Sequence, residues 1–134
     1  MNHIERILKG FPFVVLDGGL ATELEKAGHN LKDRLWSAQI LAEKPEAILD
    51  VHRSYLEAGA DCIITASYQA TVKGFISAGY SNSDAVRLIK LSVQLADNAV
   101  EQFMESFTGD NRPAPFVASS AGCYGAFLAD GSEY

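Results

Sequence analysis

The sequence lacks a long hydrophobic run. No apolar stretch approaches the roughly 20 residues that a membrane-spanning helix requires. The apolar residues 11–16 near the N-terminus are too short for an export signal, and they run into Asp17 without a small-residue cleavage site. We therefore expect a cytoplasmic protein that does not enter a membrane.

Positive charge is also in short supply. The 134 residues include 11 Lys and Arg against 17 Asp and Glu, which gives a formal net charge of −6. The basic residues are scattered along the chain, so no basic stripe is available to a polyanion. This balance argues against nucleic acids and anionic membrane surfaces as partners.

Cysteine is scarce, because the chain has only Cys62 and Cys123. Two cysteines make no disulfide framework, and we expect both to be buried thiols. The patterns C-x-x-C and H-E-x-x-H are absent, and no two histidines have the spacing of metal ligands. We expect His29 and His52 to lie beside helices at the surface or partly buried, and we expect no metal site from these residues.

Nucleotide-binding motifs are missing as well, although one stretch resembles a phosphate loop at first sight. The run "VVLDGGLATELE" passes from an apolar segment through Asp17, Gly18 and Gly19 into a helical pattern, but neither G-x-G-x-x-G nor a P-loop lysine is present. A carboxylate at this point would repel phosphate and attract a cation such as a substrate ammonium group. The two glycines would allow the backbone to approach a ligand closely. Together these features suit a zwitterionic amino acid, while the alternative that Asp17 caps the next helix remains open.

The residues that are present favour a packed α/β fold. Hydrophobic residues make up 48% of the chain, which suits a core and excludes a disordered protein. Short apolar runs alternate with helical patterns, and this alternation predicts a parallel sheet with right-handed crossovers and both faces covered. We expect strands at 13–16, 61–67 and 116–120. We expect helices at 1–10, 20–27, a short one from 37, 45–58, a short one within 68–79, and a long one after Ser81, with residues 121–134 irregular.

Each expected strand ends, at its carboxyl side, in small polar residues and glycine. In parallel α/β folds the carboxyl ends of the strands meet at one edge, where ligands bind. Thr65 and Ser67 lie two apart at a strand end, so they face the same way. Their hydroxyl groups are candidates both for ligand contacts and for hydrogen bonds to nearby backbone. Trp36 is a candidate for a pocket wall or for the anchor of a long loop.

Three longer motifs resemble the homocysteine S-methyltransferases. They are "LDGGLATELEKAGHNLKDRLWSAQIL", "PEAILDVHRSYLEAGADCIITASYQAT" and "YGAFLADGSEY". The resemblance is closest to the type that uses S-methylmethionine as methyl donor. It implies a (β/α)8 TIM-type barrel in which residues 1–134 form the first three strand–helix units, so the remainder of the barrel is absent from this sequence. It also implies methyl transfer from S-methylmethionine, or S-adenosylmethionine, to homocysteine to give methionine.

The same resemblance assigns roles to single residues. Asp17 matches the family aspartate that faces the homocysteine amino group, and Gly18 and Gly19 match glycines in backbone contact with the amino acid. Thr65 matches a pocket threonine, and Trp36 matches an aromatic residue at the pocket rim of betaine-using relatives. From their positions we add two further substrate-binding candidates, which are Ser67 and Tyr124.

In the family, zinc held by three cysteine thiolates binds the homocysteine sulfur. Neither Cys62 nor Cys123 matches one of these ligands, so the resemblance places the zinc site outside this sequence. We therefore expect the chain to be inactive alone, and we assign it no catalytic residue. The alternative is a non-catalytic binding or assembly module that is completed by another chain, or that self-associates through exposed sheet edges.

Overall fold

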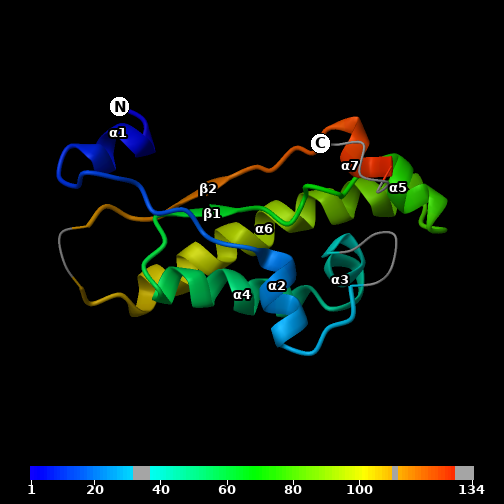
Figure 1. Ribbon diagram of the computed structural model, residues 1–134, viewed down its shortest axis with the longest axis horizontal. Coiled ribbons are helices and arrows are strands. Elements are labelled where there is room, and N and C mark those ends of the chain that lie inside the picture. Colours follow the sequence, from blue (N-terminus) through cyan, green and yellow to red (C-terminus); the bar gives the residue numbers. More distant parts are fainter. Residues whose placement is uncertain (32–36, 110–111, 129–134) are drawn as a thin grey trace.

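The computed structural model describes residues 1–31, 37–109 and 112–128 (Figure 1). In chain order the helices and strands are α1 (His3–Leu8), α2 (Leu20–Lys26), α3 (Ser37–Glu43), α4 (Pro45–Glu57), β1 (Cys62–Ile64), α5 (Val72–Ser77), α6 (Asn82–Ser106), β2 (Phe116–Ala118) and α7 (Tyr124–Leu128). None of the described helices combines the length and the apolar character that crossing a membrane requires.

The centre of the fold is a small parallel sheet. Strand β1 pairs in parallel with β2, and Cys62 lies opposite Phe116. Leu16 forms a further parallel bridge with Cys62, so the segment before Asp17 also runs alongside β1. The predicted α/β class and parallel pairing are confirmed. The strands are shorter than predicted, and the first is reduced to this single bridge.

Helices α4 and α6 lie together on one side of the sheet (Figure 1). Ile63 of β1 points into a cluster with Leu56 of α4 and with Ala96 and Ala99 of α6. A second cluster joins α2, α3, α4, α5 and α6 and contains Phe75, which is fully buried. The core therefore sits between the sheet and this helical layer.

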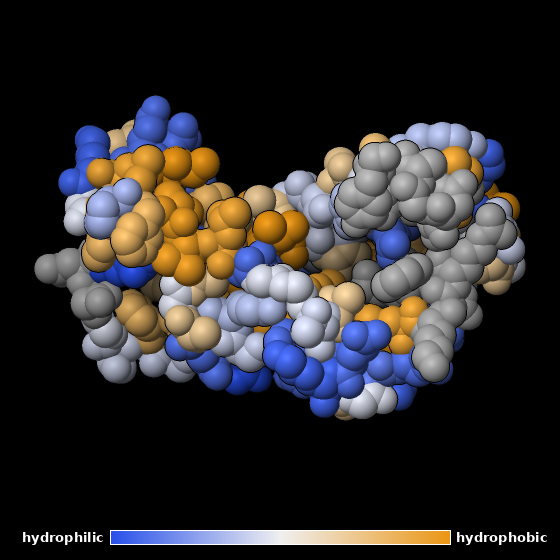
Figure 2. Space-filling view, in the orientation of Figure 1, coloured by the Kyte–Doolittle hydropathy of each residue, from blue (hydrophilic) through white to orange (hydrophobic). Residues whose placement is uncertain are grey.

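The opposite face of the sheet carries no comparable layer among the described residues. Figure 2 shows this side hollowed between the end that carries α1 and the end that carries α5. Helix α1 closes one end, where the His3 ring stacks on Phe116 at 5.3 Å and Ile7 is fully buried. We predicted cover on both faces, and the described helices supply a layer on one of them.

Local signals set the helix ends as the sequence predicts. Pro45 stands at the start of α4. Ser81 caps α6, because its Oγ accepts a hydrogen bond from the Asp84 N–H at 3.0 Å. Gly28 follows α2 in the left-handed region, with φ 89°, where glycine avoids the strain of a Cβ atom.

Helix α7 corrects the prediction that residues 121–134 are irregular. The glycines in this segment weighed against a helix, but α7 contains only Gly125. A single glycine costs about 1 kcal/mol relative to alanine, which does not prevent one helical turn.

Two predictions about single residues are wrong. His52 is buried, with 1% of its surface exposed, because it follows Ile48 by four residues and so shares the buried face of α4. Cys62 is buried as expected, but Cys123 is exposed, because it lies in the loop between β2 and α7.

Candidate functional site

A small pocket lies where the three extended segments end. Its volume is about 190 Å³. The lining residues are Asp17, Gly18, Leu20, Ile64, Thr65, Ala66, Tyr68 and Ser120. They come from the segment after Leu16, from the end of β1 and from the segment after β2. The structure thus brings together the three polar strand ends that the sequence singled out.

Asp17 has two carboxylate oxygens in different surroundings. Its Oδ2 accepts a hydrogen bond from the Ile64 N–H at 2.8 Å, and its own N–H donates to the Cys62 carbonyl at 3.0 Å. Its Oδ1 is buried and has no hydrogen-bond partner among the described residues. Burial raises the pKa of Asp17, and the hydrogen bond from Ile64 offsets this only in part. A cationic ligand group at Oδ1 would supply the missing partner.

The alternative that Asp17 caps the following helix is wrong. The N-cap residue of α2 is Gly19, and no side chain makes a capping hydrogen bond there. The Asp17 side chain turns toward β1 instead, because its Oδ2 bonds to the Ile64 backbone across the sheet.

Gly18 and Gly19 hold the turn against α4. A Cβ atom at Gly18 would lie 2.7 Å from the Tyr55 hydroxyl oxygen, so any side chain there forces the tyrosine ring to move. The same hydroxyl donates a long hydrogen bond, 3.4 Å, to the Gly19 carbonyl. The lack of a side chain at Gly18 therefore lets the turn pack closely on Tyr55. Gly18 also lines the pocket.

Thr65 and Ser67 fasten β1 to the segment that follows β2. The Ser67 Oγ donates to the Ser120 carbonyl at 2.6 Å, so the single hydroxyl proton of Ser67 is already used. In the 2.7 Å contact between the two hydroxyl groups, Thr65 is therefore the donor. The Thr65 Oγ1 also accepts from the Ser120 N–H at 2.9 Å. Both hydroxyl protons are used within the protein, so a ligand would meet Thr65 as an acceptor.

Not every predicted residue is among those that line the pocket. Ser67 is not among the residues that line it, and neither is Tyr124, which is 65% exposed. The Tyr124 ring lies 5.9 Å from the Lys73 Nζ. Trp36 lies outside the described residues. Their contacts with a substrate stay predictions.

Sequence reasoning passed over other residues that line the pocket, among them Leu20, Tyr68 and Ser120. The signal was present for two of them. Tyr68 directly follows Ser67, and Ser120 lies in the third polar strand end. Position alone did not show which residues at each end face the pocket.

The described residues do not fit a zinc centre. Among residues 1–31, 37–109 and 112–128, no three His, Cys, Asp or Glu side chains come together as a possible metal site. Burial raises the pKa of Cys62, and the charges of Asp17 and Asp61 raise it further, so the thiol form is favoured. Cys123 is exposed at the surface.

Comparison with known proteins decides the family. The family model described as homocysteine S-methyltransferase matches residues 14–134. The chain belongs to the homocysteine S-methyltransferase family. It is 56% identical over 135 residues to the homocysteine S-methyltransferase YbgG of Bacillus subtilis (strain 168), and 52% identical over 124 residues to homocysteine S-methyltransferase 3 of Zea mays. These matches cover 100% and 90% of this chain, respectively.

A solved structure gives the same result for the fold. The metallated form of the homocysteine methyltransferase MmuM from Escherichia coli superposes with a TM-score of 0.91, at 47% identity and over 99% of this chain. The chain spans less than half of these longer proteins, with 43% of the Bacillus relative, 37% of the Zea mays relative and 46% of the Escherichia coli chain covered.

Proposed function

We propose that this chain forms the part of a homocysteine S-methyltransferase that holds the amino-acid end of homocysteine. The observation that carries the proposal is the buried Oδ1 of Asp17, which has no partner among the described residues and belongs to a residue that lines the pocket. A substrate ammonium group at Oδ1 would form a charge-assisted hydrogen bond and offset the cost of burying the carboxylate.

The other lining residues would shape the site around this contact. Gly18 brings backbone close to the ligand, and the Thr65 hydroxyl oxygen offers an acceptor beside it. The hydrogen bonds of Thr65 and Ser67 to Ser120 keep two strand ends in fixed positions. In this proposal the described residues bind and orient homocysteine, and they take no part in bond making.

The proposed reaction transfers a methyl group from S-methylmethionine, or S-adenosylmethionine, to homocysteine. The homocysteine thiol loses its proton to solvent, the sulfur forms a bond to the methyl carbon, and the bond from that carbon to the sulfonium sulfur breaks. The donor leaves as a neutral thioether, so its departure needs no acid catalyst.

We propose that the family metal is zinc and that its ligands lie outside the described residues. A metallated form among the solved relatives supports a metal in the family. The described side chains form no such site, so we assign no step of the reaction to this chain through a metal.

We further propose that residues 1–134 make up the first three strand–helix units of a (β/α)8 barrel. The parallel order of the Leu16 segment, β1 and β2 supports this, as does the helical layer on one face only. In a closed barrel the inner face of the sheet is covered by side chains from other strands, which accounts for the lack of a second helical layer among the described residues.

A chimera tests the proposed function. Residues 1–134 would replace the matched N-terminal part of the Bacillus relative, and methionine formation from homocysteine and S-methylmethionine would be measured. We expect activity from the chimera and none from the 134-residue chain alone. A folded, inactive chimera would contradict the proposed activity, and methionine formation by the chain alone would contradict the proposed partial role.

A second candidate is an assembly module that associates through its sheet edges. Neither the Leu16 segment nor β2 has a strand neighbour on its outer side among the described residues. Unpaired edges favour pairing with another chain. Light scattering after size exclusion would detect such a species, and a monomer that unfolds cooperatively would remove this candidate.

A further inference from the structure

Tyr55 of α4 contacts the turn that follows Asp17. A Cβ atom at Gly18 would lie 3.1 Å from two carbons of the Tyr55 ring, in addition to its short approach to the hydroxyl oxygen. The ring therefore lies directly against the Gly18 backbone. Tyr55 is half-buried and packs against both hydrophobic clusters of the core, so the helical layer fixes its position.

Two elements hold the turn that carries Asp17. Strand β1 holds it from the sheet, because the Ile64 N–H donates to the Asp17 Oδ2 at 2.8 Å. Helix α4 holds it from the helical layer, because the Tyr55 ring lies against Gly18 and the Tyr55 hydroxyl donates to the Gly19 carbonyl. Glycine gives the backbone of this turn wide conformational freedom, so the turn depends on such contacts for a fixed position.

The start of α2 gives the turn little support of its own. Among the described residues, no side chain caps this helix. The Gly19 carbonyl accepts one hydrogen bond within the helix, from the Glu23 N–H at 3.2 Å, and a second from the Tyr55 hydroxyl. Burial raises the pKa of Tyr55, and the charges of Glu23 and Asp17 raise it further, so the hydroxyl keeps the proton that it donates.

We propose that Tyr55 is a positioning residue for the amino-acid site, because its ring holds the turn where Asp17 can reach the substrate ammonium group. Tyr55 is not among the residues that line the pocket, so it acts through Asp17 and touches no reacting atom. A charge-assisted hydrogen bond weakens when its atoms move apart, so a shift of the turn would weaken binding of the ammonium group and leave the thiol end unaffected. The inference rests on the proposed function, in which Asp17 binds that group.

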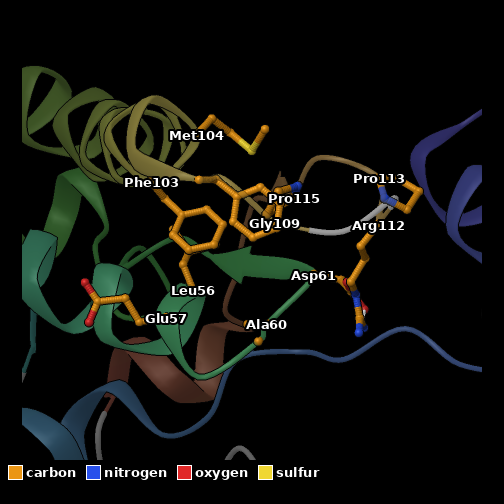
Figure 3. A pocket seen from close by; sticks show the side chains of 12 residues that line it. Leu56, Glu57, Ala60, Asp61, Phe103, Met104, Gly109, Arg112, Pro113 and Pro115 are labelled. Atoms are coloured by element: carbon orange, nitrogen blue, oxygen red, sulfur yellow. Dashed lines mark hydrogen bonds and ion pairs between the residues drawn. The ribbon is translucent and has the colours of Figure 1, made fainter.

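Phe103 of α6 provides a matched control. Like Tyr55, it is a half-buried aromatic residue that packs against the cluster containing Leu56 and Ile63. It lines a different pocket, of about 440 Å³, in which its ring lies beside Leu56 (Figure 3). Among the described residues, this pocket shares no lining residue with the pocket of Asp17. Loss of the Phe103 ring would therefore disturb the same core without touching the turn.

Kinetics of the chimera with the Bacillus relative test the role of Tyr55. The substrates are homocysteine and 4-mercaptobutanoate, which is homocysteine without its amino group, at saturating S-methylmethionine. Tyr55→Leu removes the ring contact and should raise KM for homocysteine about tenfold, within the range of a weakened charge-assisted hydrogen bond. It should leave kcat, and KM for 4-mercaptobutanoate, unchanged. Tyr55→Phe keeps the ring and should retain most of the affinity for homocysteine, and Phe103→Leu should change neither KM.

A double variant shows whether Tyr55 acts through Asp17. In a chimera that carries Asp17→Asn, Tyr55→Leu should cause no further loss with homocysteine, because the contact that Tyr55 positions is already gone. Circular dichroism would confirm that each variant folds, and Tyr55→Met replaces Tyr55→Leu if the latter does not.

Two results would overturn the role of Tyr55 alone. In both, Asp17→Asn impairs homocysteine and spares 4-mercaptobutanoate, as the proposed function requires. In the first, Tyr55→Leu impairs both substrates equally or neither, and in the second, the losses from Tyr55→Leu and Asp17→Asn add. If Asp17→Asn itself does not distinguish the two substrates, the proposed function fails and the role of Tyr55 fails with it.

Discussion

At the scale of single residues, the proposed contact with homocysteine depends on Asp17. In the sequence a carboxylate stands at the end of an apolar segment, beside two glycines. Its negative charge predicts a cationic ligand group. The structure adds that Oδ2 is held by the Ile64 N–H while Oδ1 is buried without a partner among the described residues. Sequence reasoning had no access to this difference, because it depends on how closely β1 approaches the segment after Leu16.

His52 is a second residue whose chemical properties are changed by burial. It is 1% exposed, and neither ring nitrogen has a hydrogen-bond partner among the described residues. Burial lowers the pKa of His52 from 6.5 to about 4. The imidazole is therefore neutral near pH 7 in the folded protein.

This buried imidazole makes stability depend on pH. Because the folded pKa lies below the unfolded one, the unfolded chain binds the proton more tightly. The neutral histidine is fully tolerated above pH 6.5, and stability is lost as the pH falls from there toward 4. By pH 4.5 we expect a loss of roughly 2 to 3 kcal/mol in the free energy of unfolding from this group.

Urea unfolding of the 134-residue chain at pH 7 and pH 4.5 measures the effect. His52→Leu should remove this part of the pH dependence. The matched control His29→Leu, at a partly exposed position, should retain it. An equal loss of stability on acidification in His52→Leu and in the unsubstituted chain would contradict the account.

At the scale of elements, Asp61 ties together three segments at the start of the sheet. Its Oδ1 and Oδ2 accept hydrogen bonds from Arg112 at 2.5 and 2.6 Å, and Oδ2 also accepts from the Val15 N–H at 2.7 Å. The Arg112 guanidinium in turn lies 5.0 Å from the Phe11 ring centroid. Burial alone would raise the pKa of Asp61, but the Arg112 and Val15 hydrogen bonds and the Arg112 charge lower it.

Substitution Asp61→Asn should destabilise the fold by about 3 kcal/mol, because it removes the carboxylate charge from a largely buried ion pair with Arg112. Denaturant unfolding at pH 7 checks this. As a matched control, Glu23→Gln breaks the surface pair with Lys26, whose side chain is 67% exposed, and should cause no measurable change. An Asp61→Asn variant as stable as this control would contradict the role of Asp61.

The helices were more predictable than the strands. Pro45 and Ser81 gave the starts of α4 and α6, because these signals act within a few residues. The first predicted strand proved to be a single bridge at Leu16, since strand length depends on partners distant in sequence. The candidate site was likewise predictable only where the signal is local in the sequence. The sequence located the strand ends, but the hydrogen bonds of Thr65 and Ser67 to Ser120 depend on the packing of β2 beside β1.

At the scale of the whole molecule, the chain presents surfaces that suit a larger assembly. Among the large exposed hydrophobic residues are Phe13 at 60% and Leu16 at 58%, and the apolar colour in Figure 2 gathers around α1 and the segment after it. These surfaces fit a unit whose relatives are more than twice as long. The proposed homocysteine pocket is therefore best tested in the completed barrel.

The most direct measurement compares two substrates in the chimera with the Bacillus relative. One is homocysteine, and the other is 4-mercaptobutanoate, which lacks only the amino group. If Asp17 Oδ1 binds the ammonium group, Asp17→Asn should raise KM for homocysteine by about 10- to 100-fold, the range of a lost charge-assisted hydrogen bond. It should leave the kinetics with 4-mercaptobutanoate unchanged. An equal loss with both substrates, or no loss with homocysteine, would contradict the assignment of Asp17 to the substrate amino group.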